Sequence, residues 1–250
     1  MFADGSKSSL YMYNELKRDF NISTVVIEEE GSKIKGVEGM IKEVGLFKVL
    51  GQILFQLSIP KTLEAISQKR IEQIKSAYNL DDTPIPSSAI KRVVSVSSDA
   101  CRDFIKSEKP ELIIVNGMRI IPEKVLNCTE ATFINSHVGI TPKYRGVHGG
   151  YWAMASGDEE NCGVTVFLAD TGIDTGGVLF QQVISTNSKD NFVTYPYLQI
   201  GEGIQLMKRA IFDFIDGNLK EKESLTKESK LWSHPTLWYY LKKRVLNGVK

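Results

Sequence analysis

The sequence predicts an α/β fold in which a mostly parallel sheet is flanked by helices. Short apolar runs alternate with longer, helix-patterned segments along the 250 residues, and this alternation is typical of parallel strands joined by helical connections. The composition, 42% hydrophobic and 24% charged, is that of an ordinary globular protein long enough to bury a substantial core. Together these features favour a Rossmann-like architecture.

Six apolar runs are predicted to form strands, because each is short and bounded by turn-forming residues. The predicted strands cover residues 21–28, 93–97, 112–115, 131–134, 163–168 and 178–184. A helix precedes the first of these strands, and such a helix normally follows an earlier strand. Only residues 1–3 are available for that strand, so either it is very short or the sequence starts late.

Apolar residues at helical spacing predict the helices. These cover residues 6–20, 44–59, 62–78, 98–107 and 198–214. Ser6 is a suitable N-cap for the first helix, and Ser97 or Ser98 for the fourth. Residues 30–90 are mostly helical, so we expect a helical insertion there, ended by the proline-containing turn at 81–86.

The helix at residues 44–59 is unusually apolar. Its few polar positions, Gly45, Lys48, Gln52 and Gln56, recur at a spacing near four and predict one narrow polar stripe. Such a helix packs in a core, packs against a partner or lies on a membrane surface. Packing within the fold or in a homodimer is favoured, and weak membrane-surface association remains the alternative. The segment is too short and interrupted for a transmembrane span.

Charge and cysteine usage exclude several classes of protein. The net charge of +1 does not indicate nucleic-acid binding. Cys101, Cys128 and Cys162 lie far apart and form no C-x-x-C, which favours a reducing compartment over a disulfide framework or a zinc site. We expect no metal, since the chain has three histidines and a zinc site built from His137 and His148 would lack ligands. No export signal opens the chain, so we expect a cytoplasmic protein.

Polar side chains gather in the central stretch. Asn135 and His137 follow the apolar run at 131–134, and a Gly/Pro-rich loop at 139–150 carries Lys-Tyr-Arg. The strand at 163–168 runs into a loop of aspartates and glycines at 170–177. Because ligands bind beyond the carboxyl ends of strands in open α/β sheets, an Asn, a His and an Asp are expected to converge there.

These motifs resemble the folate-dependent formyltransferase family, which includes glycinamide ribonucleotide, methionyl-tRNA and sugar N-formyltransferases. Its pattern is N-x-H, then L-P-x-Y-R-G, then G-V-T, then D-x-G-x-D-x-G. Residues 135–137, 141–146, 163–165 and 170–176 match this pattern in order and spacing. The resemblance covers roughly residues 111–184. The chain departs from it at Ser136, where the family commonly has an apolar residue, and at residues 139–142, where many members read S-L-L-P.

The resemblance implies N10-formyltetrahydrofolate as donor and a primary amine as acceptor. In such an enzyme Asn135 and His137 would stabilise the oxyanion, and Asp174 and His137 would move protons. Amide and imidazole groups are suitable hydrogen-bond donors to an oxyanion, and imidazole and carboxylate groups are suitable proton carriers. The segment 116–121 resembles the loop that holds the pterin ring through backbone groups. The expected folate contacts are Asn116, Met118, Arg119, Ile120, Asp170 and Gly172. The expected acceptor contacts are Tyr144, Arg145, Gly146 and His148.

Some of these assignments have alternatives. Arg145 either binds a phosphate of the acceptor or stabilises the conformation of its own loop. His148 is an acceptor-side or a structural residue. Asp170 is a second carboxylate near the site or, preferably, a turn residue. A Ser-His-Asp hydrolase built on Ser136 is not expected, because adjacent strand residues point to opposite faces.

The leading functional hypothesis is an N-formyltransferase that acts on a nucleotide-linked amino sugar. Residues 1–184 are then the catalytic domain and residues 185–250 a C-terminal helical extension packed on it. That extension is short for the tRNA-binding domain of methionyl-tRNA formyltransferases, so nucleic acid is not expected. A methionyl-tRNA or glycinamide ribonucleotide formyltransferase, a formyltetrahydrofolate hydrolase and a degenerate scaffold remain alternatives.

Overall fold

The computed structural model describes residues 1–29, 37–118 and 120–250. Its main sheet has seven strands in the order β3-β2-β1-β4-β5-β7-β8. The first five in this order are parallel, whereas β7 is antiparallel to both β5 and β8. The strands are β1 (Phe2–Ala3), β2 (Val25–Glu28), β3 (Ile90–Val93), β4 (Leu112–Asn116), β5 (Thr132–His137), β7 (Gly163–Leu168) and β8 (Val178–Val183). The expected α/β fold with a mostly parallel sheet is confirmed.

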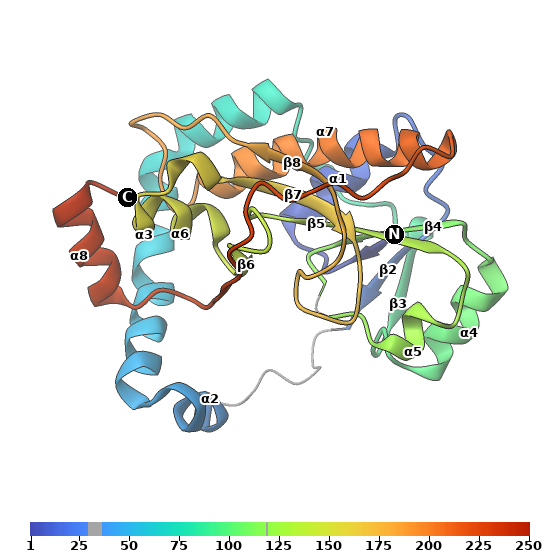
Figure 1. Cartoon of the computed structure of the whole chain (residues 1–250), viewed down its shortest axis with the longest axis horizontal. Helices are drawn as coiled ribbons and strands as arrows, with labels where there is room; N and C mark the ends of the chain where they lie inside the picture. The colour runs from blue at the N-terminus through green and yellow to red at the C-terminus, as the bar shows by residue number, and fades with distance from the viewer. Residues whose placement is uncertain (30–36, 119) are drawn as a thin grey trace.

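Helices cover both faces of this sheet (Figure 1). They are α1 (Lys7–Leu16), α2 (Val37–Val44), α3 (Leu46–Tyr78), α4 (Asp99–Glu108), α5 (Glu123–Leu126), α6 (Gly149–Ser156), α7 (Tyr195–Ile215) and α8 (Leu237–Asn247), with 3-10 turns at Ser87–Ala89 and Glu159–Asn161. The helices α1 and α7 share one buried apolar cluster with β4, β5, β7 and β8, and α4 and α5 pack on the opposite face. Within the described residues, no helix is both long and apolar enough to cross a membrane.

The first strand is very short but central. Phe2 and Ala3 are 2% and 0% exposed, and they pair with β2 on one side and β4 on the other. Two residues suffice because both edges of the strand are hydrogen-bonded. The chain adds β2 and β3 on one side of β1 and then β4 and β5 on the other side. The strand order therefore reverses between β1 and β4, and α/β sheets bind ligands at such a point.

Several strand boundaries differ from the sequence prediction; the strand expected at 21–28, for example, begins only at Val25. The strand expected at 93–97 is β3, which ends at Val93, because Ser98 donates its hydroxyl to the Ser95 carbonyl and forms a turn instead. Ser98 then caps α4 by accepting from the Cys101 N–H, as expected for its side chain. The run expected to stop before Asn135 continues as β5 through His137.

The two helices expected at 44–59 and 62–78 are one helix, α3, with Pro60 inside it. Gly45, at φ 85°, separates α3 from α2. Of the four positions in the expected polar stripe, Gln52 is 2% exposed and donates to the Ser233 hydroxyl and the His234 carbonyl. The amide is buried because the C-terminal segment supplies its partners, which a helical pattern alone does not reveal.

A second, aromatic-rich core joins the helical insertion to the end of the chain. Phe55 of α3 packs edge-on against Phe192, with ring centroids 4.9 Å apart, and lies 5.4 Å from the ring of Tyr240 in α8. The same cluster contains Tyr151 and Trp152 of α6. It lies at the end of the molecule remote from β3 and β4 (Figure 1) and fixes α3, α6 and α8 relative to one another.

Phe55→Ala is expected to lower the free energy of unfolding by about 3–5 kcal/mol, because it opens a cavity in this second core. Phe47→Ala is the matched control, since Phe47 lies on the same helix but is 70% exposed. Urea unfolding followed by circular dichroism measures both. Equal effects of the two substitutions would contradict the assignment of Phe55 to a core.

Candidate active site

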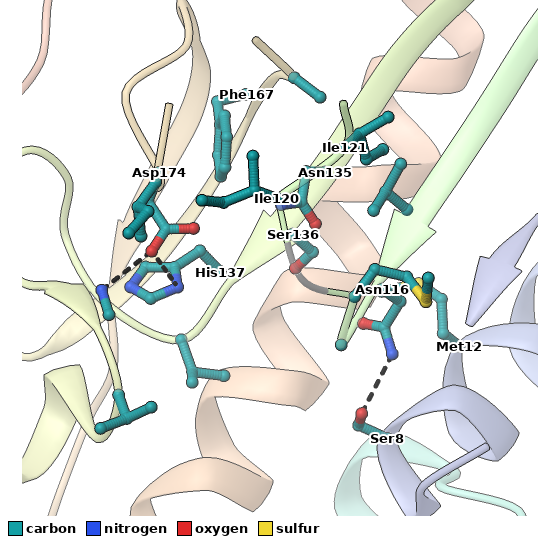
Figure 2. Close-up of a pocket in the computed structure, with 18 of the residues that line it drawn as sticks. Ser8, Met12, Asn116, Ile120, Ile121, Asn135, Ser136, His137, Phe167 and Asp174 are labelled. Carbon is teal, nitrogen blue, oxygen red and sulfur yellow. Dashed lines mark hydrogen bonds and ion pairs between the residues drawn. The ribbon is translucent and has the colours of Figure 1, made fainter. Parts of the chain in front are cut away.

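A cavity of about 720 Å³ opens at the carboxyl ends of β1, β4 and β5. Figure 2 shows Asp174 and His137 at one end of this cavity and Asn116 and Ser8 at the other, with Asn135 also among the residues that line it. Its volume falls in the range of small-molecule sites. Asn135, His137 and Asp174 thus all line this one cavity.

Alternation along β5 decides which side chains can act together. Asn135 pairs with Phe167 and His137 with Thr165 across the antiparallel partner β7, so both residues face the same side of the sheet. Ser136 faces the other side, where its hydroxyl lies 2.9 Å from the position a side chain at Gly203 of α7 would take. Ser136 is among the residues that line the cavity, but its hydroxyl is directed towards α7, so it does not form a Ser-His pair.

His137 is held by both ring nitrogens. Its Nε2 lies 2.7 Å from the Tyr144 carbonyl oxygen, and since a carbonyl only accepts, Nε2 carries a hydrogen. Its Nδ1 faces Asp174 Oδ2 at 3.4 Å. The imidazole is 8% exposed. The imidazole is therefore oriented by a backbone carbonyl on one side and a carboxylate on the other.

Asp174 is fixed by the backbone as well as by His137. The Gly146 N–H donates to Asp174 Oδ2 at 2.9 Å, and Asp174 itself has a left-handed φ of 51°. Gly146 has φ 92°, and an added Cβ there would lie 2.4 Å from the Trp232 carbonyl oxygen. Glycine is required at this position because the small two-stranded sheet of β6 (Arg145–Gly146) and β9 (Leu231–Trp232) leaves no room.

The expected acceptor contacts separate into two groups. Gly146 and His148 line the cavity. The Tyr144 side chain lies in the core instead, 1% exposed, with its hydroxyl donating to Asp158, so only its carbonyl contributes, by holding His137. Arg145 lies beside the cavity, donates through Nη1 to the Ile173 carbonyl, and leaves Nε without a partner within the described structure.

The expected folate contacts lie mostly on the far side of the cavity. Asn116, Met118 and Ile120 line it, whereas Arg119 lies outside the described residues. Asn116 donates to the Ser8 hydroxyl at 3.0 Å, which links β4 to α1 (Figure 2). Gly117 fits tightly, since a Cβ there would lie 2.5 Å from the Asp4 carboxyl carbon.

Asp170 and Gly172 line the rim of the cavity and also build the loop that carries Asp174. Asp170 accepts from the Gly172 N–H and from the Thr175 hydroxyl, which is the geometry of a turn-forming aspartate. Gly172 has no space for a side chain, because its Cβ would lie 1.9 Å from the Thr175 hydroxyl oxygen.

Several lining residues were not predicted from the sequence. They come from α1, β7, the loop before Asp174 and α7: Ser8, Met12, Phe167, Ile173, Pro196 and Ile200. The place of Ser8 in the cavity could have been predicted, since Ser8 follows the first strand at the ligand-binding edge of the sheet. The others are apolar or helical residues whose place depends on packing between distant elements. Among the described residues, no group of three or more His, Cys, Asp and Glu could hold a metal ion.

His148 joins the cavity to the C-terminal segment. Its Nε2 lies 2.9 Å from His234 Nδ1, and its ring packs against Phe192. Burial lowers the pKa of His148 to about 3, with a smaller contribution from His234. Burial also lowers the pKa of His234. The pair is therefore neutral at neutral pH and acts as a structural link in the cavity wall.

Acid is expected to destabilise the protein through His148. In the folded state its pKa is about 3, and in the unfolded chain about 6.5, so between these values only the unfolded state binds the proton. The contribution of neutral His148 to the free energy of unfolding is fully present above pH 6.5, and it falls by about 2 kcal/mol between pH 7.5 and pH 5.0. Urea unfolding of the wild type and His148→Gln at both pH values tests this. A stability difference between them that does not shrink at pH 5.0 would contradict it.

Comparison with known proteins places this geometry in a family. A methionyl-tRNA formyltransferase of Thermodesulfovibrio yellowstonii is 41% identical over 91 residues, covering 36% of this chain and 29% of that protein. One of Caldanaerobacter subterraneus is 30% identical over 126 residues, covering 50% and 40%. The chain thus spans less than half the length of either relative.

One solved structure shares the fold over most of the chain. The sugar 3N-formyl transferase WlaRD, crystallised in the presence of dTDP and 5-N-formyl-THF, superposes with a TM-score of 0.52 at 15% identity and covers 93% of this chain and 68% of that one. A sugar N-formyltransferase from a Shewanella species gives a TM-score of 0.49 at 22% identity, covering 70% and 71%. The family model described as formyl transferase matches residues 23–197, well over half of the 250 residues, and the chain belongs to this family.

Proposed function

We propose that this protein transfers a formyl group from N10-formyltetrahydrofolate to the primary amine of an amino sugar carried by a nucleotide. The observation that carries the proposal is the convergence of Asn135, His137 and Asp174 on one cavity. An amide donor beside an imidazole–carboxylate pair suits attack of an amine on a formyl carbon, which builds negative charge on oxygen and releases protons.

The far side of the cavity fits the ring of a folate. Val115, Met118, Ile120, Ile121 and Phe167 supply apolar walls, which suit a flat heterocycle. Polar groups that can hydrogen-bond to the edge of the ring are present too, because the backbone of residues 117–118, directly after β4, also lines the cavity. The bound folate would supply the activated formyl group, and these residues would orient it towards Asn135.

Asn135 is the best-placed donor for the developing oxyanion. Within the described part of the chain its amide has no hydrogen-bond partner, whereas both nitrogens of His137 already face protein groups. The His137–Asp174 pair therefore supports proton movement more directly than charge stabilisation. The amine gives up a proton as it attacks, and His137 Nδ1 can hold it against Asp174 before it passes to the leaving nitrogen.

Charge around the cavity favours a small amine. The described lining includes two carboxylates, Asp170 and Asp174, which favour the amine end of an acceptor. Arg145 lies beside the cavity and donates through Nη1 to the Ile173 carbonyl, and its guanidinium charge suits a phosphate of the nucleotide. The fold match that covers 93% of this chain belongs to a sugar 3N-formyl transferase, which also supports a sugar acceptor.

Formylation of methionyl-tRNA is the second candidate. The observation in its favour is the sequence similarity to methionyl-tRNA formyltransferases, at 41% and 30% identity over 91 and 126 residues. The two candidates make different demands on the surface beyond the cavity, since a tRNA acceptor adds phosphate contacts and a strong salt dependence.

Release of tetrahydrofolate from N10-formyltetrahydrofolate distinguishes the candidates. The acceptor panel consists of dTDP- and UDP-linked amino sugars, glycinamide ribonucleotide, methionyl-tRNA and no acceptor. Turnover with one amino sugar, confirmed by the mass of its formamide, is the expected result. Turnover with methionyl-tRNA alone would establish the second candidate, and turnover without acceptor would show a hydrolase.

Asn135→Ala is expected to lower kcat about 10²–10³-fold with a smaller effect on folate affinity, because it removes a donor that acts mainly in the transition state. Thr132→Ala is the matched control on the same strand, since Thr132 is not among the residues that line the cavity, and its kcat should stay near wild type. Steady-state kinetics and folate titration of both variants measure the difference. Loss of folate binding in Asn135→Ala with kcat retained would contradict the assigned role.

A further inference from the structure

The side of α3 that faces away from the second core is apolar and exposed. Leu46, Leu50, Leu54 and Leu57 recur at spacings of four, four and three, which places them on one side of the helix. They are 65%, 47%, 41% and 62% exposed. The same helix buries its other side against the protein, so this row of leucines is not the face that stabilises the fold.

The helix α8 extends this apolar surface. Phe47 of α3 stacks on Trp238 of α8, with ring centroids 4.1 Å apart and an angle of 22°. Leu241 and Val245 follow Trp238 on α8 and are 45% and 81% exposed. The two helices lie together at one end of the molecule (Figure 1). We call the apolar surface formed by these side chains the α3–α8 face; it comprises Leu46, Phe47, Leu50, Leu54, Leu57, Trp238, Leu241 and Val245.

The two chain segments that contain and flank this face are basic. Residues 37–62 and 237–250 together contain seven basic and two acidic residues, a net charge of +5. Since the whole chain carries +1, the remainder carries −4. The basic residues include Lys61, which follows Leu57 at helical spacing, and the Lys242–Lys243–Arg244 run of α8. Such long side chains extend their charge past an apolar surface into a polar layer.

We infer that the α3–α8 face binds the surface of an anionic lipid bilayer. A one-sided row of leucines with aromatic rings and a basic rim is the pattern of a helix that lies in the membrane interface, and Trp and Phe favour that layer. Anionic lipids attract lysine and arginine near the surface. The helices lie on the bilayer without crossing it.

A second copy of the chain fits this face less well. A two-fold dimer places the same surface of both subunits together, so a region of net charge +5 would meet its own copy. Like charges across an interface oppose association. A negatively charged lipid surface has the complementary charge and accepts a flat apolar row without needing a matching groove.

Vesicle co-sedimentation of the full chain tests the inference. The probes are phosphatidylcholine vesicles with and without phosphatidylserine, at low and high salt. Binding is expected to the phosphatidylserine vesicles and to weaken as salt increases. The double variant Leu50→Glu/Leu54→Glu should bind at least about tenfold less, since it replaces two inserted leucines. Replacing Lys242, Lys243 and Arg244 by Gln should remove the preference for phosphatidylserine.

Ile66→Glu is the matched control. Ile66 lies on α3 and is 71% exposed, but helical periodicity places it off the leucine row, so this variant should bind vesicles as the wild type does. Circular dichroism and formyl transfer to a soluble acceptor check that each variant is folded, since none of these residues lines the cavity.

Three outcomes would overturn the inference. One is no binding of the wild type to phosphatidylserine vesicles, and another is an equal loss in Ile66→Glu and the leucine variant. The third is a dimer in sedimentation velocity that the leucine variant dissociates, which would assign the face to a second copy. None of these outcomes bears on the transferase proposal, which the acceptor panel tests in the absence of lipid.

Discussion

The hydrogen bond from the Gly146 N–H to Asp174 is the constraint on which the site depends. It joins the loop after β5 to the loop after β7 at 2.9 Å, and the same Asp174 oxygen faces His137. The carbonyl of Tyr144, two residues before Gly146, holds the other nitrogen of His137. One short segment of backbone therefore positions both members of the pair, and their relative geometry does not rely on flexible side chains.

The cavity is asymmetric in a way that matches a two-substrate reaction. One end has apolar walls and backbone groups after β4, and the other has His137, Asp174 and the loop of Gly146 and His148. Asn135 lines the same cavity and projects from the same face of β5 as His137. A donor group and an acceptor amine that approach from opposite ends would therefore meet at the amide. This arrangement restricts the reaction to groups that fit both ends at once.

The sequence predicted the parts of the fold that depend on local pattern. The strand at residues 163–168 agrees with β7 in both boundaries, because its alternation and flanking turns are local. The motif residues around Asn135 and Asp174 were also found, since their order and spacing resemble a known family. Burial of Gln52 and Tyr144 was not predicted, because their partners, His234 and Asp158, are supplied by other elements. A helical pattern also cannot tell which apolar side of α3 remains exposed.

The pairing of β6 with β9 has a consequence for how the protein is made. Arg145 and Gly146 pair with Leu231 and Trp232, nearly ninety positions later in the chain. A contact of such large sequence separation closes a long loop and forms slowly. During synthesis the main sheet can assemble first. The pairing of β6 with β9, which positions Gly146 beside Asp174, can form only after residue 232 has left the ribosome. The nascent chain thus lacks the backbone pairing beside Gly146 until the segment that contains β9 has been synthesised.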